Sequence, residues 1–288
     1  MSEPDPDRYL EDLIATQPLR EPVLREAVRI LRVPPGSRGL DAGCGAGRPV
    51  LLLADAVGPE GHVSGIDASE LFVRHARGIA ARAGMSDRVS FEVGDLFRLP
   101  YEDGRFDWLW SVDCALYLAV DRPELIRELV RVVRPGGVVA LLAWSSQMLL
   151  PGFPGLESRL NATRAGIAPF RGGSPETHFL RALEWLRGAG LEECRAHTLA
   201  SGAQAPLSGE ERRGIEALLR MRWEGARAEV AREDWERYRR LCSPDSPEFI
   251  LRLEGYYAFF TYTMFVGRVP DPRGRADAPA PGRHGEEL

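Results

Sequence analysis

The feature that most constrains this chain is a glycine-rich turn between two apolar segments. Residues 37–41 have the composition of a short strand, and residues 49–57 have the length and apolar character of a helix. Between them, Gly43, Gly45 and Gly47 occupy alternate positions. Glycine adopts left-handed backbone conformations and lets the chain pass close to a ligand. The segment therefore predicts a strand, a tight turn and a helix, with a ligand at the turn.

Two classes of ligand bind at turns of this kind. Dinucleotide-binding folds carry the pattern G-x-G-x-x-G and place a pyrophosphate over the N-terminus of the helix. Here Arg48 stands where the third glycine would be, and Asp41 would bring a negative charge beside the diphosphate. A carboxylate suits a cationic ligand better, such as S-adenosylmethionine, whose amino and sulfonium groups are positive and which has no phosphate.

The stretch D-x-G-x-G-x-G resembles the first motif of class I S-adenosylmethionine-dependent methyltransferases. The resemblance implies that Asp41, Gly43, Gly45 and Gly47 hold the methionine end of the cofactor. Cys44 lies among these cofactor-binding residues, where a small side chain is required, and no chemistry is assigned to it.

A second strand, residues 62–67, ends in Asp67, one strand–helix–strand unit after the turn. A carboxylate at this point accepts hydrogen bonds from the ribose hydroxyls in nucleotide-binding folds. NAD-dependent enzymes share this feature, so Asp67 indicates an adenosine site without naming the cofactor. Ala68 follows in the same cofactor-binding loop, and Ser69 is expected to cap a helix over residues 69–83.

A third strand, residues 88–93, is followed by Gly94, Asp95 and Leu96. In the family resembled, the acid accepts a hydrogen bond from the adenine amino group and the next residue flanks the base, which assigns these roles to Asp95 and Leu96. The alternative is that Asp95 only forms a turn, as aspartates after glycine commonly do. The two earlier motifs at compatible spacing favour the ligand role.

The next segments continue the resemblance. Residues 106–112 predict a fourth strand, residues 123–133 a helix, and residues 138–144 a fifth strand after the turn R-P-G-G. The order of motifs over residues 37–144 resembles class I methyltransferases, in particular the group with the ubiquinone and menaquinone C-methyltransferases and many natural-product enzymes.

The remaining segments complete the predicted fold. Helices within residues 9–31, interrupted at Pro18 and Pro22, either cover the cofactor or simply pack on the sheet. Later in the chain, the sequence predicts a loop-rich connection over 145–174, a helix over 175–189, strands six and seven over 191–200 and 256–267, and helices over 210–223, 226–241 and 247–253.

The predicted fold class is α/β, with a Rossmann-like, seven-stranded, mostly parallel sheet whose last strand is antiparallel, and with an inserted helical lid. The expected organisation is a disordered N-terminus (1–8), a methyltransferase domain (9–204 and 254–269), a helical lid between strands six and seven (205–253) and a disordered tail (270–288).

Three residues are candidates for contact with the methyl acceptor. Methyl transfer from a sulfonium depends mainly on aligning the acceptor atom, the methyl group and the sulfur in a water-poor pocket. Asp113, at the end of the fourth strand, is the first candidate for acceptor contact or general base, followed by Tyr117 and His178. The alternatives are a helix N-cap for Asp113, a core position for Tyr117 and an exposed, idle histidine for His178.

Composition excludes several classes of partner. The net charge of −5 argues against a general nucleic-acid binder, and the absence of lysine excludes Schiff-base and P-loop lysine chemistry.

No apolar run approaches the ~20 residues that span a bilayer, and the acidic N-terminus lacks the layout of a signal peptide. The four cysteines lie far apart without C-x-x-C spacing, and no cluster of His, Asp or Glu indicates a metal. We expect a cytoplasmic monomer or homodimer with no nucleic-acid, membrane or metal partner.

The sequence thus predicts an S-adenosylmethionine-dependent methyltransferase. The expected reaction is direct in-line transfer of the methyl group to O, C or N of a small molecule, apolar or aromatic. The alternatives are a methyltransferase acting on RNA or protein, and a non-catalytic cofactor-binding subunit.

Overall fold

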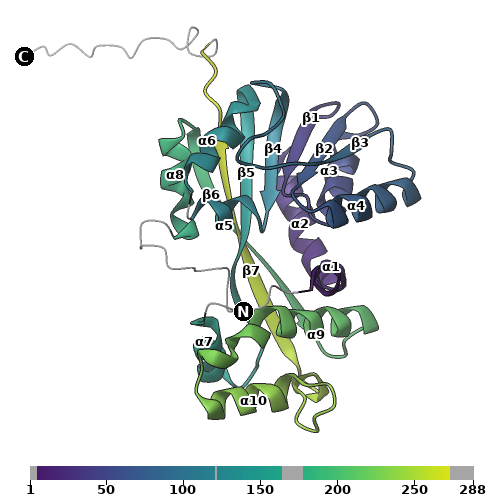
Figure 1. Ribbon diagram of the computed structural model, residues 1–288, viewed down its shortest axis with the longest axis vertical. Coiled ribbons are helices and arrows are strands. Elements are labelled where there is room, and N and C mark those ends of the chain that lie inside the picture. The colour runs from purple at the N-terminus through teal and green to yellow at the C-terminus, as the bar shows by residue number, and fades with distance from the viewer. Residues whose placement is uncertain (1–4, 121, 164–177, 273–288) are drawn as a thin grey trace, which may run out of the picture.

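A seven-stranded sheet runs through the centre of the computed structural model, which describes residues 5–120, 122–163 and 178–272. The strand order is β3-β2-β1-β4-β5-β7-β6. Five strands pair in parallel, and β7 is antiparallel to both of its neighbours (Figure 1). The strands are β1 (Arg38–Ala42), β2 (His62–Asp67), β3 (Val89–Val93), β4 (Phe106–Val112), β5 (Val133–Met148), β6 (Glu192–Gln204) and β7 (Tyr257–Arg268). The predicted fold class is confirmed.

Helices cover both faces of this sheet because its parallel strands are apolar on both sides. On one face, α2 (Gln17–Leu31), α3 (Arg48–Val57) and α4 (Glu70–Arg82) pack on Trp108 and Trp110. On the other face, α5 (Ala115–Ala119), α6 (Glu124–Arg131) and α8 (Ala182–Gly188) pack on Leu40 and Leu109. Neighbouring residues of one strand thus enter different cores, as the alternation of side chains in a strand requires.

The three strands β5, β6 and β7 continue below the parallel part of the sheet (Figure 1). There they meet α7 (Pro154–Asn161), α9 (Gly209–Trp223) and α10 (Arg232–Cys242). Two 3-10 turns, η3 (Glu224–Ala228) and η4 (Ile250–Arg252), complete the segment between β6 and β7. Buried residues of these helices, such as Trp223 and Leu241, belong to the same hydrophobic core as α2 and α3. The lower helices therefore share one core with the nucleotide-fold part.

The N-terminal region differs from the expectation in two respects. The first helix, α1 (Pro6–Ala15), begins at Pro6, where the Asp5 side chain caps it, so residues 6–8 are helical and not disordered. The break between α1 and α2 lies at Thr16, while Pro18 sits in the first turn of α2 and Pro22 lies inside that helix. Pro22 is tolerated because it removes a single helical hydrogen bond near the helix start.

The predicted loop over 145–174 is also wrong in part. The strand β5 extends to Met148 because its last residues pair with Phe259 and Phe260 of β7, and α7 follows. The predicted helix over 175–189 is shorter, with the 3-10 turn η2 (Phe179–Arg181) leading into α8. In the lower part, residues 226–231 and 247–253 form 3-10 turns and connections where helices were expected. Residues 164–177 and most of the predicted tail, 273–288, lie outside the described residues.

Candidate functional site

The glycine turn between β1 and α3 has no room for side chains at two of its positions. A Cβ atom at Gly43 would lie 2.3 Å from the Cys114 sulfur, and one at Gly47 would lie 2.6 Å from the Cβ of Ala76. Both glycines also have left-handed φ angles, of 81° and 86°. The turn is therefore held against the start of α5 on one side and against α4 on the other.

The carboxylate of Asp67 ties this turn to the following loop. Its Oδ2 accepts a hydrogen bond from the Gly45 amide and its Oδ1 accepts one from the Ser69 amide, both at 2.9 Å. Ser69 in turn caps α4, as the sequence predicts. A carboxylate has about four acceptor positions, so one on each oxygen of Asp67 is left for a ligand.

Asp41 is the most unusual group of the site. Its carboxylate is 0% exposed, and neither oxygen has a hydrogen-bond partner among the described residues. Burial raises the pKa of this carboxyl well above its usual range, and the negative charge of Asp67 raises it further. A charged carboxylate buried without a partner is costly, so Asp41 favours either its neutral form or a cationic group beside it.

The other predicted cofactor residues lie around the same turn. The amides of Gly43 and Cys44 both donate to the Ile66 carbonyl, which leaves the Cys44 amide with a partner inside the protein. Leu96 is buried, and its Cδ1 lies 3.8 Å from where a Gly43 Cβ would be. Asp95 is exposed, and its Oδ1 accepts from the Phe97 amide, so it does form the local turn. Asp95 and Ala68 are both exposed, in the loops after β3 and β2.

The leading helix α1 lies over the glycine turn. Leu13 Cδ2 would be 3.7 Å from a Cβ at Gly45, and the Tyr9 ring stacks on Phe72 of α4 with 6.0 Å between centroids. The helix α1 thus packs against the residues expected to hold the cofactor, and both alternatives for the leading helices, covering the cofactor or only packing on the fold, stay open.

The carboxylate of Asp113, the residue after β4, accepts four hydrogen bonds from residues of different elements. Its Oδ1 accepts from the Trp144 amide at 2.9 Å and from the Tyr117 hydroxyl at 3.1 Å. Its Oδ2 accepts from Arg20 and from the Tyr262 hydroxyl, both at 2.6 Å. These four bonds hold Asp113 at a φ of 52°, which is uncommon for a residue other than glycine. Because the carboxylate bonds here, the N-cap alternative for Asp113 is wrong; Cys114 is the N-cap residue of α5.

Tyr117 and His178 lie on either side of one aromatic ring. Phe179 contacts Tyr117 edge-on at 5.8 Å and stacks on His178 at 5.0 Å. Burial, and after it the charge of Asp113, raises the pKa of Tyr117 well above its usual range. The Nδ1 of His178 accepts a hydrogen bond from the Leu180 amide, so His178 caps η2, and burial lowers its pKa. The structure thus brings Asp113 and Tyr117 into direct contact and places His178 one ring further away.

Comparison with known proteins assigns the family. Residues 35–164 match the family described as "Methyltransferase domain". The 27-O-demethylrifamycin SV methyltransferase of Amycolatopsis mediterranei is 31% identical over 274 residues, which cover 91% of this chain and 89% of that protein. The chain belongs to the class I S-adenosylmethionine-dependent methyltransferases.

This methyltransferase also resembles other proteins, either in sequence over a shorter stretch of chain or in the fold alone. Further curated relatives are 31–36% identical, and the chain spans 30–60% of their length. The YcgJ protein of Bacillus subtilis shares the fold at 17% identity with a TM-score of 0.53, covering 87% of this chain and 99% of that one. A geranyl diphosphate methyltransferase in complex with S-adenosylmethionine aligns with a TM-score of 0.50 at 17% identity, covering 93% of this chain and 92% of that one. As a member of the class I methyltransferases, the enzyme uses S-adenosylmethionine as its cofactor.

Four residues beside Asp113 were missed by sequence reasoning. Burial raises the pKa of Tyr9, while its hydroxyl feels the charges of Arg20, Asp113 and Arg222. Arg222 of α9 lies over the Trp144 indole, 4.3 Å from the ring centroid. None of these residues has a local sequence signal, because they come from α1, α2, β5 and α9 and meet only in the folded methyltransferase. They are Tyr9, Arg20, Trp144 and Arg222.

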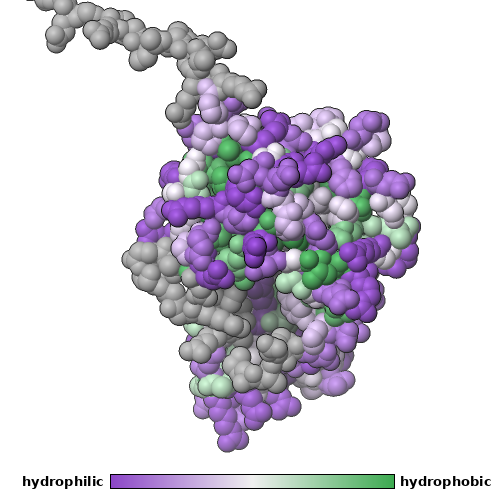
Figure 2. All heavy atoms as spheres, turned by 45° about the horizontal axis from the view of Figure 1, so that its top comes forward, coloured by the Kyte–Doolittle hydropathy of each residue, from purple (hydrophilic) through white to green (hydrophobic). Residues whose placement is uncertain are grey.

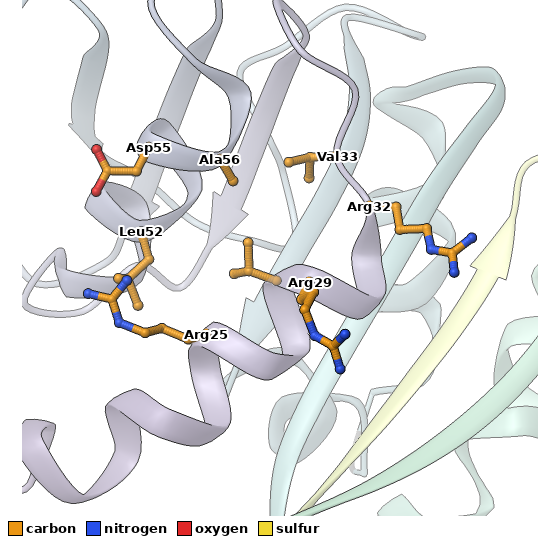
Figure 3. Close-up of a pocket in the computed structure, with 8 residues that line it drawn as sticks. Arg25, Arg29, Arg32, Val33, Leu52, Asp55 and Ala56 are labelled. Carbon is orange, nitrogen blue, oxygen red and sulfur yellow. The ribbon is translucent and has the colours of Figure 1, made fainter.

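A hollow on the outer side of α2 and α3 is lined by Arg25, Arg29 and Asp55, and its arginines point in different directions (Figure 3). Arg25 and Arg29 pair with glutamates of their own helix. Figure 2 shows a mainly hydrophilic face with scattered hydrophobic patches. The side chains of Trp144 and Tyr262 are buried.

Two absences hold for the described part of the chain. No group of three or more His, Cys, Asp or Glu residues in it could hold a metal ion. None of its helices combines the length and the apolar character needed to cross a membrane.

Proposed function

We propose that this methyltransferase moves the methyl group of S-adenosylmethionine by direct in-line transfer to O, C or N of a small, apolar or aromatic molecule. The single observation that carries the proposal is the group of aromatic residues at the end of β4. Next to the glycine turn, the hydroxyls of Tyr117 and Tyr262 donate to Asp113, and the Trp144 indole lies edge-on to the Tyr262 ring with 5.5 Å between centroids. The name of the relative from Amycolatopsis mediterranei, a methyltransferase of demethylrifamycin, supports a small-molecule acceptor.

The residues of the glycine turn fit the cofactor. Asp41 offers a buried carboxylate without a partner to a cationic amino group, and the glycines Gly43, Gly45 and Gly47 let the backbone approach it. Asp67 keeps free acceptor positions for the ribose hydroxyls.

The adenine end would bind at the next loop. Asp95 and Leu96, after β3, would hold the adenine, and Ala68 would contact the cofactor from the loop after β2, beside Asp67. Cys44 would contribute a small side chain, since its amide already donates to Ile66. When bound, the cofactor supplies an electrophilic methyl group.

The protein's part in the reaction is positioning. Asp113 already accepts four hydrogen bonds, so we assign it to hold Tyr117 and Tyr262 in place and not to remove a proton. Tyr117 would contact the acceptor, since its hydroxyl stands next to Asp113. His178 would act as a cap: with Nδ1 accepting from Leu180, the neutral ring carries its proton on Nε2 and has no lone pair free for a base.

The helices between β6 and β7 would form a lid over the acceptor. The chain from 205 to 253 contributes α9, whose Arg222 reaches the ring of Trp144. A cytoplasmic location, and a monomer or homodimer without nucleic-acid or membrane partners, complete the proposal; the net charge of −5 supports the absence of nucleic acid.

A two-step experiment tests this function. Calorimetric titration with S-adenosylhomocysteine should give micromolar affinity, about −8 kcal/mol, in the wild type. Asp67→Ala should lose that binding, while Asp87→Ala, at an exposed position, should keep it. Transfer of a radiolabelled methyl group is then measured on small-molecule extracts, RNA and protein. Incorporation into RNA or protein, or no transfer at all, would contradict the proposal.

A further inference from the structure

Arg222 differs from the other arginines around the acceptor side of the site. Arg20 is paired with Asp113 at 2.6 Å, and Arg220, on the same helix α9, is paired with Asp12 at 2.5 Å. Within residues 5–120, 122–163 and 178–272, the side chain of Arg222 has neither an ion pair nor a hydrogen bond. A guanidinium has five N–H donors and no acceptor, so Arg222 presents unused donors to whatever lies beside it.

The Trp144 ring fixes the position of this guanidinium. Arg222 lies 4.3 Å from the ring centroid, and Phe260 stacks on the same indole at 4.3 Å with an interplanar angle of 15°. Trp144 is 1% exposed, and its own indole N–H has no acceptor in the described chain. The pair Arg222 and Trp144 therefore combines two kinds of unused donor with a rigid aromatic support.

The charge of Arg222 reaches the hydroxyls that surround Asp113. Burial raises the pKa values of Tyr117, Tyr262 and Tyr9, and the positive charge of Arg222 opposes that rise in all three. These tyrosines come from α5, β7 and α1, so the charge of Arg222 acts on hydroxyl groups from three different elements.

We propose that Arg222, supported by Trp144, is a subsite for an anionic oxygen of an aromatic acceptor, either an ionised phenol or enol or a carboxylate. An anionic oxygen supplies the acceptor that these donors lack, and a charge-assisted hydrogen bond in a partly buried site is stronger than one between neutral groups. The inference rests on the proposed function, because it concerns the acceptor of that same reaction.

Arg237 provides a matched control. It also lies over an aromatic ring, Phe153, with 4.9 Å to the centroid, but it is exposed on α10. Replacing either arginine by glutamine removes one positive charge and one cation–π contact. Only the loss of Arg222 should affect the binding of an acceptor.

The test is a binding measurement on the enzyme saturated with S-adenosylhomocysteine. Two probe pairs are titrated calorimetrically: 4-nitrophenolate against its methyl ether 4-nitroanisole, and benzoate against methyl benzoate. Wild type and Arg237→Gln should bind at least one of the anions about ten-fold or more tightly than its uncharged ether or ester. Arg222→Gln should lose that preference, and the pair affected tells whether the oxygen is of the phenol type or the carboxylate type.

Three binding results would contradict an anionic subsite at Arg222. Equal affinity for anion and neutral probe in the wild type, no binding of any probe, or an unchanged preference in Arg222→Gln would overturn the subsite. Binding of S-adenosylhomocysteine to each variant shows that it is folded, and Arg222→Met, which keeps a long side chain over Trp144, replaces the glutamine variant if that one fails. Absence of S-adenosylhomocysteine binding in the wild type would instead refute the proposed function itself.

Discussion

The Tyr262 hydroxyl donates to Asp113 Oδ2 at 2.6 Å, although the two residues are 149 positions apart in the chain. The same hydroxyl accepts from Arg20 Nε at 2.9 Å. The last strand of the sheet is thereby linked to the end of β4 and to the helix α2. Asp113, next to the glycine turn, depends on residues from both ends of the sequence for its position.

Loss of this hydroxyl should destabilise the protein. Tyr262→Phe removes two buried hydrogen bonds to charged groups and leaves Arg20 Nε without its acceptor, and we expect a cost of about 2–3 kcal/mol in the free energy of unfolding. Tyr257→Phe, at a ring that is 54% exposed, should change stability by less than about 0.5 kcal/mol. Urea denaturation of both variants measures the difference. Equal stabilities would show that the network around Asp113 contributes little.

Close packing at the glycine turn leads to a second prediction. Gly47→Ala places an alanine in a left-handed backbone conformation, which costs about 1–2 kcal/mol of stability. The substitution also forces a Cβ to within 2.6 Å of Ala76. We expect a larger loss of stability than from Gly84→Ala, where φ is 67° and the added carbon would meet no atom within 4 Å. Binding of S-adenosylhomocysteine should weaken only in Gly47→Ala. A similar loss of stability in both variants would mean that the contact with α4 relaxes freely.

The sequence predicts the parallel half of the fold well because its signals are local. Apolar runs bounded by glycine or aspartate mark β2 and β4 at the residues where the structure has them, and the turn around Gly45 precedes α3 as expected. The end of β5 was missed because residues 145–147 are polar, and only pairing with β7 makes them a strand.

The acceptor side of the site could not be predicted in the same way. Asp113 was identified from its place after β4, but its partners Arg20 and Tyr262 are 93 and 149 residues away and have no motif of their own. Arg222 looks like one of many arginines on a charged helix, and only the folded chain sets it over Trp144. Tertiary contacts between distant elements decide these roles.

The buried carboxylate of Asp41 leads to a prediction about stability and pH. Its pKa is raised in the folded protein, so the folded state keeps a proton that the unfolded state has lost, and stability falls as the pH rises from the ordinary carboxyl range through the folded pKa. Asp41→Asn should remove this loss of stability at higher pH. Without cofactor, the variant should therefore be at least as stable as the wild type at neutral pH, and the difference in stability should shrink as the pH falls. Asp55→Asn, at an exposed position, should leave the pH profile unchanged. Thermal melting across the pH range measures both; a variant less stable than wild type at neutral pH would contradict the account.

The same group should release a proton when the cofactor product binds. Burial raises the pKa of Asp41, so this carboxyl keeps its proton to a higher pH than an ordinary one, and a cationic amino group beside it would lower that pKa again. Binding of S-adenosylhomocysteine should then release up to about one proton per site, which appears as a dependence of the calorimetric enthalpy on the ionisation enthalpy of the buffer. In Asp41→Asn that dependence should vanish and the affinity should fall about ten-fold or more, since the buried charge that pairs with the amino group is gone. If the wild type shows the same enthalpy in phosphate and in Tris, Asp41 does not change its protonation on binding, and the cationic end of the cofactor is held by other groups of the turn.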